Sequence, residues 1–243
     1  MTEFTLHRLL NKLKRRSLFT PDDEAALLAL PFSVKSFKPG GYLVRQGDRR
    51  DFASVLFNGF AYRQKVVGNG GRQIVALHVE GDAVDLQNSL LKTADHSVQA
   101  LGAVDVGRIP CEALLAIAAA RPVIAQALWL DTLADGAIAL EWITNIGRRN
   151  ALSRLAHLLC EIALRLEAID LYEDGSRLLP MTQVQMGDSL GLTAVHVNRM
   201  FGQLEEVRLI ARKNRAVIIL DLQGLRSIAD FQTAYLHLDL LDN

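Results

Sequence analysis

The chain has 243 residues, half of them hydrophobic and 22% charged, a composition that can bury a core within one large domain or two small ones. Lys plus Arg and Asp plus Glu number 27 each, so the chain as a whole is not polycationic. Two cysteines exclude a disulfide-rich scaffold, and the charged N-terminus is not a signal peptide. No stretch reaches the roughly 20 uninterrupted apolar residues of a membrane span. We therefore expect a cytoplasmic protein with reduced thiols.

Charge is unevenly distributed along the chain. Residues 1–50 carry ten basic and five acidic side chains, whereas residues 51–147 carry six basic and ten acidic ones. Between residues 191 and 220, Glu205 and Glu206 are outnumbered by five bases: Arg199, Arg208, Arg212, Lys213 and Arg215. A basic face on a neutral chain is typical of a docking surface for a polyanion, although an ordinary solvated face gives the same pattern.

The first 110 residues change from a helical to a strand pattern. Leucines recur at helical spacing over residues 6–13, and Thr20 and Pro21 predict the start of a second short helix. From residue 32 onward the apolar period is two, with turn sequences at 39–41, 58–59, 68–71 and 80–82. Short strands at this spacing predict an antiparallel sandwich or barrel and not a parallel sheet.

A long apolar helix is predicted over residues 122–146. Apolar residues cover most of its circumference, so the helix needs cover on more than one side. A stripe of Ala127, Leu130, Ala134 and Ala137 predicts close pairing with the same helix of a second subunit. The alternative is a central helix buried within one chain. The segments that follow are predicted as a hinge, an amphipathic helix and a loop, over residues 147–150, 151–168 and 172–177.

Residues 182–207 predict a helix-turn-helix. Thr182 caps a short helix that ends at Leu190, and after a tight turn Thr193 caps a second helix over residues 194–207. The second helix of such a motif lies in the DNA major groove, with its exposed N-terminal residues on base edges. The apolar positions have the inward spacing of this motif, at Val184, Met186, Leu190, Leu192, Val197, Met200, Phe201 and Leu204.

Four residues near the start of the second helix are predicted to face DNA. Arg199 is the best guanine reader, because its planar guanidinium matches O6 and N7 of guanine. His196 and Asn198 are candidates for a base or a phosphate, and Val195 for a thymine methyl group. A wing with a basic tip follows, and such tips commonly lie on the phosphate backbone. The remaining predicted DNA-binding residues are therefore Arg212, Lys213 and Arg215 of the wing and the two caps Thr182 and Thr193.

The order of β-domain, long apolar helix and winged helix resembles the CRP/FNR superfamily of bacterial transcription regulators. The matching residues are Lys38-Pro39-Gly40, Gln46-Gly47-Asp48, Leu56-Phe57-Asn58-Gly59, Gly81-Asp82 and the motif from Thr182 to Ile210. The resemblance implies an α+β fold whose N-terminal sensor domain is an antiparallel jelly roll, or double-stranded β-helix. Its predicted parts are the cyclic-nucleotide-binding-like roll with its N-terminal helices, the dimerisation helix and the winged helix-turn-helix, over residues 1–121, 122–147 and 148–243.

The same resemblance implies partners. Members of the superfamily are homodimers that bind a palindromic promoter site in double-stranded DNA, and activators also contact RNA polymerase. A membrane partner is not implied. In the second helix, Val195 stands where many members have a glutamate that accepts from cytosine, so the superfamily's usual half-site is not expected here.

The predicted effector pocket departs from the pattern of members that bind cyclic AMP. Those members carry Gly-Glu-Leu and then Arg-Ser-Ala around the cyclic phosphate, where this chain has Val84-Asp85-Leu86 and His96-Ser97-Val98. The loss of the arginine and the added charge of Asp85 argue against a cyclic nucleotide bound in the usual way. The pocket candidates are Asp85, Leu86, His96 and Ser97.

No cofactor is predicted. Oxygen-sensing members hold an iron–sulfur cluster with four cysteines, and this chain has Cys111 and Cys160. Haem stays open, because a single histidine is enough to bind it.

Two other classes of protein are the alternatives. A cupin-like enzyme needs a His-x-His metal pair, which the sequence lacks, and no nucleotide loop or catalytic triad is present. No enzyme and no metal site is therefore predicted. The second alternative is a ligand-sensing or protein-interaction module of the same fold with weak or no DNA binding. Arg199 and the basic wing argue against it and favour a sequence-specific transcription regulator, an activator by the habit of the superfamily.

Overall fold

A computed structural model describes residues 4–169, 176–178, 181–213 and 216–238. The described residues form two compact units. The N-terminal unit draws on residues 1–65, 76–137 and 236–243, and the C-terminal unit on residues 66–75 and 138–235. The division falls inside the long helix, between Ala137 and Ile138.

Two short helices open the N-terminal unit, α1 (His7–Lys14) and α2 (Pro21–Leu28). The hydroxyl of Thr20 accepts a hydrogen bond from the Asp23 amide, and the Asp23 carboxylate accepts one from the Thr20 amide. This capping box satisfies amides that would otherwise have no partner at the helix start. The predicted start of α2 is confirmed.

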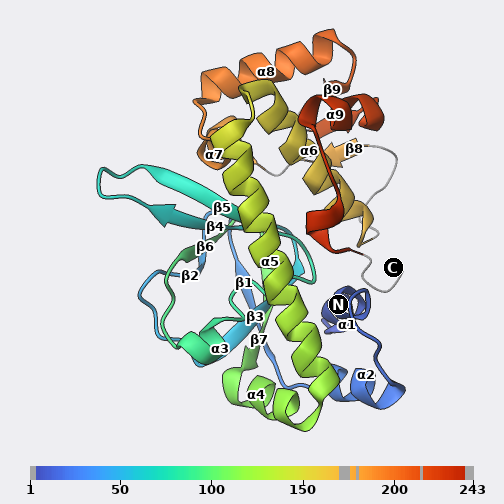
Figure 1. The fold of residues 1–243 in the computed structure, drawn as a ribbon. Helices are drawn as coiled ribbons and strands as arrows, with labels where there is room; N and C mark the ends of the chain where they lie inside the picture. The colour runs from blue at the N-terminus through green and yellow to red at the C-terminus, as the bar shows by residue number, and fades with distance from the viewer. Residues whose placement is uncertain (1–3, 170–175, 179–180, 214–215, 239–243) are drawn as a thin grey trace. The chain divides into compact units, whose positions relative to one another are not determined.

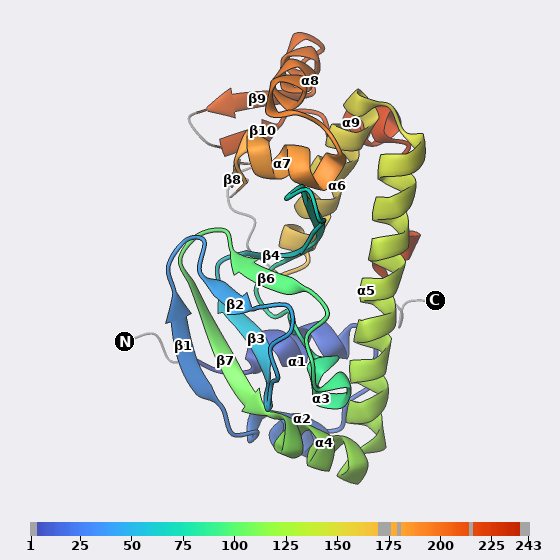
Figure 2. The same cartoon turned by 90° about the vertical axis from the view of Figure 1, so that its left-hand side faces the viewer.

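The strands between residues 33 and 110 form two sheets; residues 66–75 of this stretch belong to the C-terminal unit and the rest to the N-terminal unit. One has the order β1 (Ser33–Phe37), β7 (Val104–Pro110), β3 (Phe52–Asn58), and the other has the order β2 (Tyr42–Val44), β6 (Ser97–Ala100), β4 (Ala61–Val66), β5 (Arg72–His78). Figure 2 shows β1, β7 and β3 side by side. The pairs with a described register are antiparallel, which confirms the antiparallel β prediction. The N-terminal unit has two further helices, α3 (Asn88–Leu91) and α4 (Cys111–Ala120).

Two apolar clusters hold the N-terminal unit together. One joins Leu9 and Leu13 of α1 to residues of β3 and β7 and to Ile124 of the long helix. The other includes Leu56 and Val106 and lies among the strands. Because burying one such side chain contributes about 1.5–3 kcal/mol, α1 is an integral part of this unit.

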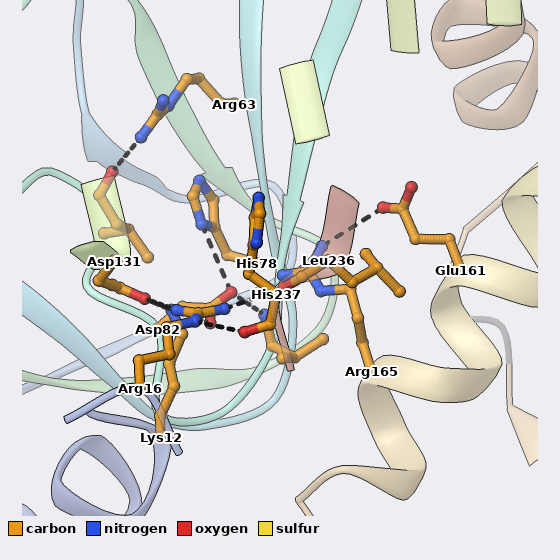
Figure 3. Close-up of polar contacts among 12 residues, drawn as sticks. Lys12, Arg16, Arg63, His78, Asp82, Asp131, Glu161, Arg165, Leu236 and His237 are labelled. Atoms are coloured by element: carbon orange, nitrogen blue, oxygen red, sulfur yellow. Dashed lines mark hydrogen bonds and ion pairs between the residues drawn. The ribbon is translucent and has the colours of Figure 1, made fainter. Parts of the chain in front are cut away.

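A buried group of charges also holds α1 in place (Figure 3). Lys12 Nζ lies 2.8 Å from an oxygen of Asp82 and 2.8 Å from an oxygen of Asp131. Arg16 pairs with the same Asp131 and donates to the main-chain carbonyls of Leu236 and His237. Burial opposes the charge of Lys12, but Asp131 and Asp82 outweigh it and raise the pKa of Lys12 above its usual value. We call Lys12, Arg16, Asp82 and Asp131 the buried charge cluster.

The predicted long helix is α5 (Pro122–Arg148). Its length and mean hydropathy would suit a membrane span, but a core helix of a soluble protein has the same properties. Ile124, Ala127 and Leu128 pack in the same apolar cluster as α1, and Asp131 belongs to the buried charge cluster. The first half of α5 is therefore an element of the N-terminal unit.

Another face of α5 is apolar and exposed. The exposed fractions are 68% for Trp129, 55% for Leu133, 68% for Leu140 and 67% for Ile143. The predicted pairing stripe is wrong, since its residues Ala127 and Ala134 are buried within the chain itself. Periodicity could not distinguish the two faces, because the helix is apolar nearly all round.

The C-terminal unit is a set of helices around a three-stranded sheet. Its helices are α6 (Ala151–Glu167), α7 (Gln183–Leu190), α8 (Ala194–Glu206) and α9 (Leu222–Ala229). The 3-10 turn η1 (Ala234–Leu236) follows, and its last residue, Leu236, is assigned to the N-terminal unit. The sheet is antiparallel, in the order β8 (Ser176–Leu178), β10 (Ala216–Ile219), β9 (Ile210–Lys213). The predicted α+β class with a terminal winged helix-turn-helix is confirmed.

The predicted loop over residues 172–177 is wrong at its end. Residues 172–175 lie outside the described residues, but Ser176 and Arg177 belong to β8 and pair with Ile218 and Val217 of β10. This pairing joins segments about 40 residues apart, and a strand of three residues carries no alternating pattern that would reveal it.

A buried carboxylate joins the second half of α5 to α6 and the end of the chain. Glu161 accepts hydrogen bonds from the Trp142 indole at 3.0 Å and from the Tyr235 hydroxyl at 2.9 Å. Burial raises the pKa of Glu161, although Arg165 acts in the opposite direction. The paired donors make this acid a structural residue of the C-terminal unit.

His157 of α6 is buried beside this carboxylate group. Its ring centroid lies 4.8 Å from that of Phe231 and 5.8 Å from that of Tyr235. Its Nε2 atom is 3.2 Å from Glu141. Burial and the charge of Arg149 lower the pKa of His157 to about 4, against the effect of Glu141. The imidazole is therefore neutral at neutral pH.

Candidate nucleic-acid interface

Helices α7 and α8 and the turn between them form the predicted helix-turn-helix (Figure 1, orange). The Thr182 hydroxyl accepts from the Gln185 amide at 3.2 Å, and the Gln185 side chain accepts from the Thr182 amide at 2.8 Å. Gly191 ends α7 in the left-handed conformation, with φ of +65°, which glycine adopts without steric cost. The Thr193 hydroxyl accepts from the His196 amide at 3.2 Å. Both predicted caps and the turn are confirmed.

The two helices approach closely at the turn. A Cβ atom on Gly187 would collide with the main-chain oxygen of Leu192, and Met186, Val197 and Phe201 are buried. Val184 was predicted to face inward but is 57% exposed. Residues two positions apart in an α-helix point in directions that differ by about 200° around the helix axis. A helix that buries Met186 therefore turns Val184 outward.

The N-terminal part of α8 carries the predicted reading residues. Val195 is 82% exposed, Asn198 and Arg199 are exposed, and His196 is partly exposed. Arg199 Nη2 donates to His196 Nε2 at 2.7 Å. Because a guanidinium has no acceptor, the Nε2 atom of this imidazole must be unprotonated and accept the bond. His196 thus orients Arg199 at the solvent face of α8.

A second polar group links α7, α8 and the wing strand β9. Asn198 Oδ1 accepts from Gln183 Nε2 at 3.2 Å and from Arg212 Nη1 at 2.9 Å. Glu205 accepts from Arg212 twice, from its amide at 3.0 Å and from Nη2 at 2.6 Å. The hydrogen bond from Arg212 lowers the pKa of Glu205. We call Gln183, Asn198, Glu205 and Arg212 the wing network.

The other predicted DNA-binding residues fall into two groups. Lys213 is exposed at the end of β9, and Arg215 lies outside the described residues. Thr182 and Thr193 use their hydroxyl oxygens as helix caps. Each capping hydroxyl keeps its O–H as a donor.

In the N-terminal unit, Asp85 of the predicted effector pocket is fully buried. Its carboxylate accepts from the Ser54 amide at 2.5 Å and from the Ser54 hydroxyl at 3.2 Å. Burial raises the pKa of Asp85 to about 6, against the hydrogen bonds of Ser54 and the charge of Arg50. Arg50 Nη2 lies 3.8 Å from this carboxylate. Residues of the chain itself therefore engage Asp85.

The other pocket candidates also have partners within the chain. His96 is buried and contacts Asp95 and Gln87, at 2.5 and 3.2 Å. Burial, together with the charge of Arg63, lowers the pKa of His96 to about 4. The Ser97 hydroxyl accepts from the Gln46 amide at 3.0 Å, and Leu86 packs against the apolar cluster of α1.

Arg63 of β4 was not among the predicted site residues. Its charge acts on both Asp85 and His96, and its Nη2 donates to the carbonyl of Val84 at 3.1 Å. A guanidinium is thus present near the candidate pocket, but it comes from a strand and not from the segment that carries His96. The alternation of β4 predicted its strand, while its side-chain partners depend on the tertiary fold.

Comparison with known proteins matches both parts of the chain. A cyclic nucleotide-binding domain matches residues 34–121, and a Crp-like helix-turn-helix domain matches residues 153–228. The structure of FixK2 from Bradyrhizobium japonicum is similar with a TM-score of 0.74 at 23% identity, over 82% of this chain and 98% of that one.

Two proteins that are similar in sequence are also regulatory proteins. The transcriptional activator protein FnrL of Cereibacter sphaeroides is 30% identical over 210 residues, 84% of this chain and 83% of that protein. The nitrogen fixation regulation protein FixK of Rhizobium meliloti is 29% identical over 205 residues, 82% of this chain and 89% of that protein. This chain belongs to the CRP/FNR family of transcription regulators.

As a CRP/FNR regulator, the protein is a DNA-binding transcription regulator, and the predicted function is confirmed at this level. Its cysteines occupy different settings: Cys111 opens α4 and is partly exposed, and Cys160 is buried in α6. Among the described residues, no three His, Cys, Asp or Glu side chains are grouped as they would be to hold a metal ion.

The wing network is the other feature that sequence reasoning missed. Gln183 and Glu205 were not singled out, although Glu205 appeared among the acids that oppose the basic stretch. The available signal was the seven-residue spacing of Asn198 and Glu205, which places both on one face of α8 about two turns apart. The spacing of residues along the sequence does not show that the wing brings Arg212 to this face of α8.

Proposed function

We propose that this protein binds a palindromic promoter site in the cytoplasm as a homodimer and activates transcription there through contact with RNA polymerase. The observation that carries the proposal is the capped helix-turn-helix whose α8 exposes Val195, Asn198 and Arg199 to solvent. Such residues at the N-terminal end of a recognition helix contact base edges in the major groove. The activating role is supported by relatives such as FnrL, which is named as a transcriptional activator.

Each reading residue has a role that follows from its chemistry. Arg199, oriented by His196, donates to O6 and N7 of a guanine, and Val195 packs against a thymine methyl group. The hydroxyls of Thr182 and Thr193 donate to phosphates at the N-terminal ends of their helices. Lys213 and Arg215 supply sequence-independent contacts to the phosphate backbone.

The exposed apolar face of α5 supports the dimer. This face repeats in steps of four, three, four and three residues, at Trp129, Leu133, Gly136, Leu140 and Ile143. This 3.5-residue average repeat is that of a coiled-coil seam, which buries its apolar residues against an identical helix. A second copy of this chain presents the same seam, so pairing covers all of these residues at once.

The candidate effector pocket supports DNA binding without a cyclic nucleotide. Asp85 is held by Ser54, and His96 contacts Gln87 and Asp95, so the chain supplies its own partners at these positions. A cyclic phosphate would have to be placed near the buried carboxylate of Asp85, which repels it when ionised. We therefore propose that the ligand-free protein is competent to bind its site.

Selection of bound sequences from a random duplex pool, using the purified protein without added ligand, tests this function. We expect enrichment of a palindrome with a guanine in each half-site. A pool that shows no enrichment, either alone or after addition of cell extract, would contradict DNA binding. Enrichment only with extract would contradict the proposed ligand independence.

The dimer seam has its own test. Leu140→Glu places a charge in the seam and should shift the mass measured by sedimentation equilibrium from dimer to monomer. Leu90→Glu is the matched control, because Leu90 of α3 is similarly exposed at 72% and lies outside the seam. If both variants stay dimeric, the seam is not the dimer interface.

A further inference from the structure

Asn198 is held by donors from two other elements. Its Oδ1 atom accepts from Gln183 at the start of α7 and from Arg212 in the wing strand β9. A carboxamide oxygen has two lone pairs, so these two hydrogen bonds use its full acceptor capacity. The side chain is exposed, and its two contacts fix which way the amide plane points.

The assignment of the amide's oxygen and nitrogen follows from chemistry. Oxygen and nitrogen of an asparagine amide are distinguished by their partners. Arg212 can only donate, so the Asn198 atom that faces its guanidinium must be the oxygen. The opposite atom is then the Nδ2 amino group, which carries two N–H donors and no acceptor. Toward DNA, Asn198 can therefore offer donors alone.

Arg212 is itself anchored. Glu205 accepts from both its main-chain amide and its Nη2, and the guanidinium lies 5.2 Å from the centroid of the buried Phe201 ring. The carboxylate of Glu205 neutralises the charge of Arg212 at close range. A neutralised and hydrogen-bonded guanidinium has little left to attract a phosphate. Arg212 thus serves to position Asn198, whereas the exposed Lys213 next to it is available for the backbone.

We propose that Asn198 recognises a hydrogen-bond acceptor of DNA through its amino group alone, and that Gln183 and the Arg212–Glu205 pair act as positioning residues that fix this orientation. The inference rests on the proposed function, because it names the chemistry that one residue of the α8 reading surface recognises. The acceptor is a base atom in the major groove, such as N7 of a purine or O4 of thymine, or a phosphate oxygen.

Asn198→Asp separates the two roles of this side chain. The carboxylate has nearly the same shape and can still accept from Gln183 and Arg212, so the wing network is kept. It replaces the two outward donors by an acceptor, which repels the acceptors of DNA. We expect affinity for the selected palindrome to fall about 10-fold or more, the loss of one good base contact.

Repeating the selection with Asn198→Asp identifies the acceptor. A changed preference at one base pair in each half-site indicates a base atom, and a uniform loss on all sequences indicates a phosphate. Binding within about 2-fold of the wild type with unchanged preference would overturn the inference, since it would make the amino group irrelevant. A urea unfolding curve like that of the wild type shows that the variant folds.

The positioning role of Arg212 is tested by salt dependence. Loss of one phosphate contact reduces the slope of log K against log salt by about 1. Lys213→Ala should show this reduction, whereas Arg212→Ala should weaken binding without changing the slope. A slope reduced by about 1 in Arg212→Ala would show that Arg212 contacts a phosphate, and its positioning role would be wrong. Failure of the wild type to select any sequence would instead contradict the proposed function itself.

Discussion

Two groups of charged side chains in this protein use the same chemistry in opposite surroundings. In the buried charge cluster, the side chains of Arg16 and Asp131 are 5% and 3% exposed. In the wing network, those of Arg212 and Glu205 are 33% and 31% exposed. A buried charge that loses its partner is strongly destabilising, whereas an exposed pair contributes little to stability. The first group therefore maintains the fold, and the second can be specialised for orienting groups toward a ligand.

The largest effect should follow from breaking the buried charge cluster. Asp131→Ala leaves Lys12 and Arg16 buried without the carboxylate that they share. We expect the free energy of unfolding, measured by urea denaturation, to fall by about 3–5 kcal/mol. Glu24→Ala breaks the more exposed Lys14–Glu24 pair and should cost about 0–1 kcal/mol. Equal losses in the two variants would contradict the comparison.

Protonation of a buried histidine should be the next largest effect. The pKa of His157 lies at about 4 in the folded protein and at about 6.5 in an unfolded chain. The unfolded state therefore binds the proton more tightly, and stability is lost as the pH falls from about 6.5 to 4. A difference of this size corresponds to about 3 kcal/mol when complete.

The pH effect can be isolated with one variant. His157→Phe keeps an aromatic ring beside Phe231 and Tyr235 but cannot be protonated. The difference in unfolding free energy between wild type and variant should change in the variant's favour over this pH range. His78 and His96, whose pKa values are also lowered by burial, act equally in both proteins and cancel. A difference that is constant with pH would refute the assignment.

On the exposed side, the reading arginine should matter for DNA and not for the fold. Arg199→Ala should cost about 1–3 kcal/mol of binding to the selected palindrome and relax one base position in each half-site. The free energy of unfolding should stay within about 0.5 kcal/mol of the wild type. Arg49→Ala removes the same charge from an exposed position of the N-terminal unit and should leave both quantities unchanged.

The smallest effect should come from the wing tip. Lys213→Ala should weaken binding to all sequences alike, by about the contribution of one phosphate contact. Fluorescence titrations on the palindrome and on a scrambled duplex measure this directly. A change of base preference in this variant would show that Lys213 reads sequence, contrary to its proposed role.

The sequence predicted those features that depend on near neighbours. The caps Thr20, Thr182 and Thr193 and the left-handed Gly191 are local devices, and each lies where it was expected. The strand pattern of the N-terminal unit follows from alternation and turn residues, which also act over a few positions.

Features that depend on distant contacts could not be predicted. Lys12 and Asp131 are 119 residues apart, and no local pattern marks them as a pair. Ala127 is buried in the cluster that contains α1, and Ala134 is also buried within the chain, so the apolar stripe of α5 pointed to the wrong partner. Asn198 was found as a reading residue, but its orientation is fixed by Arg212, which the fold of the wing brings to it.

The most direct test of the account is a stoichiometric titration of the purified protein, without ligand, against the selected palindrome and a single half-site. We expect tight binding of two chains to one palindromic duplex, and much weaker binding to the half-site. Binding of one chain with equal affinity for both duplexes, or no binding to either, would contradict a dimeric reader that needs no effector.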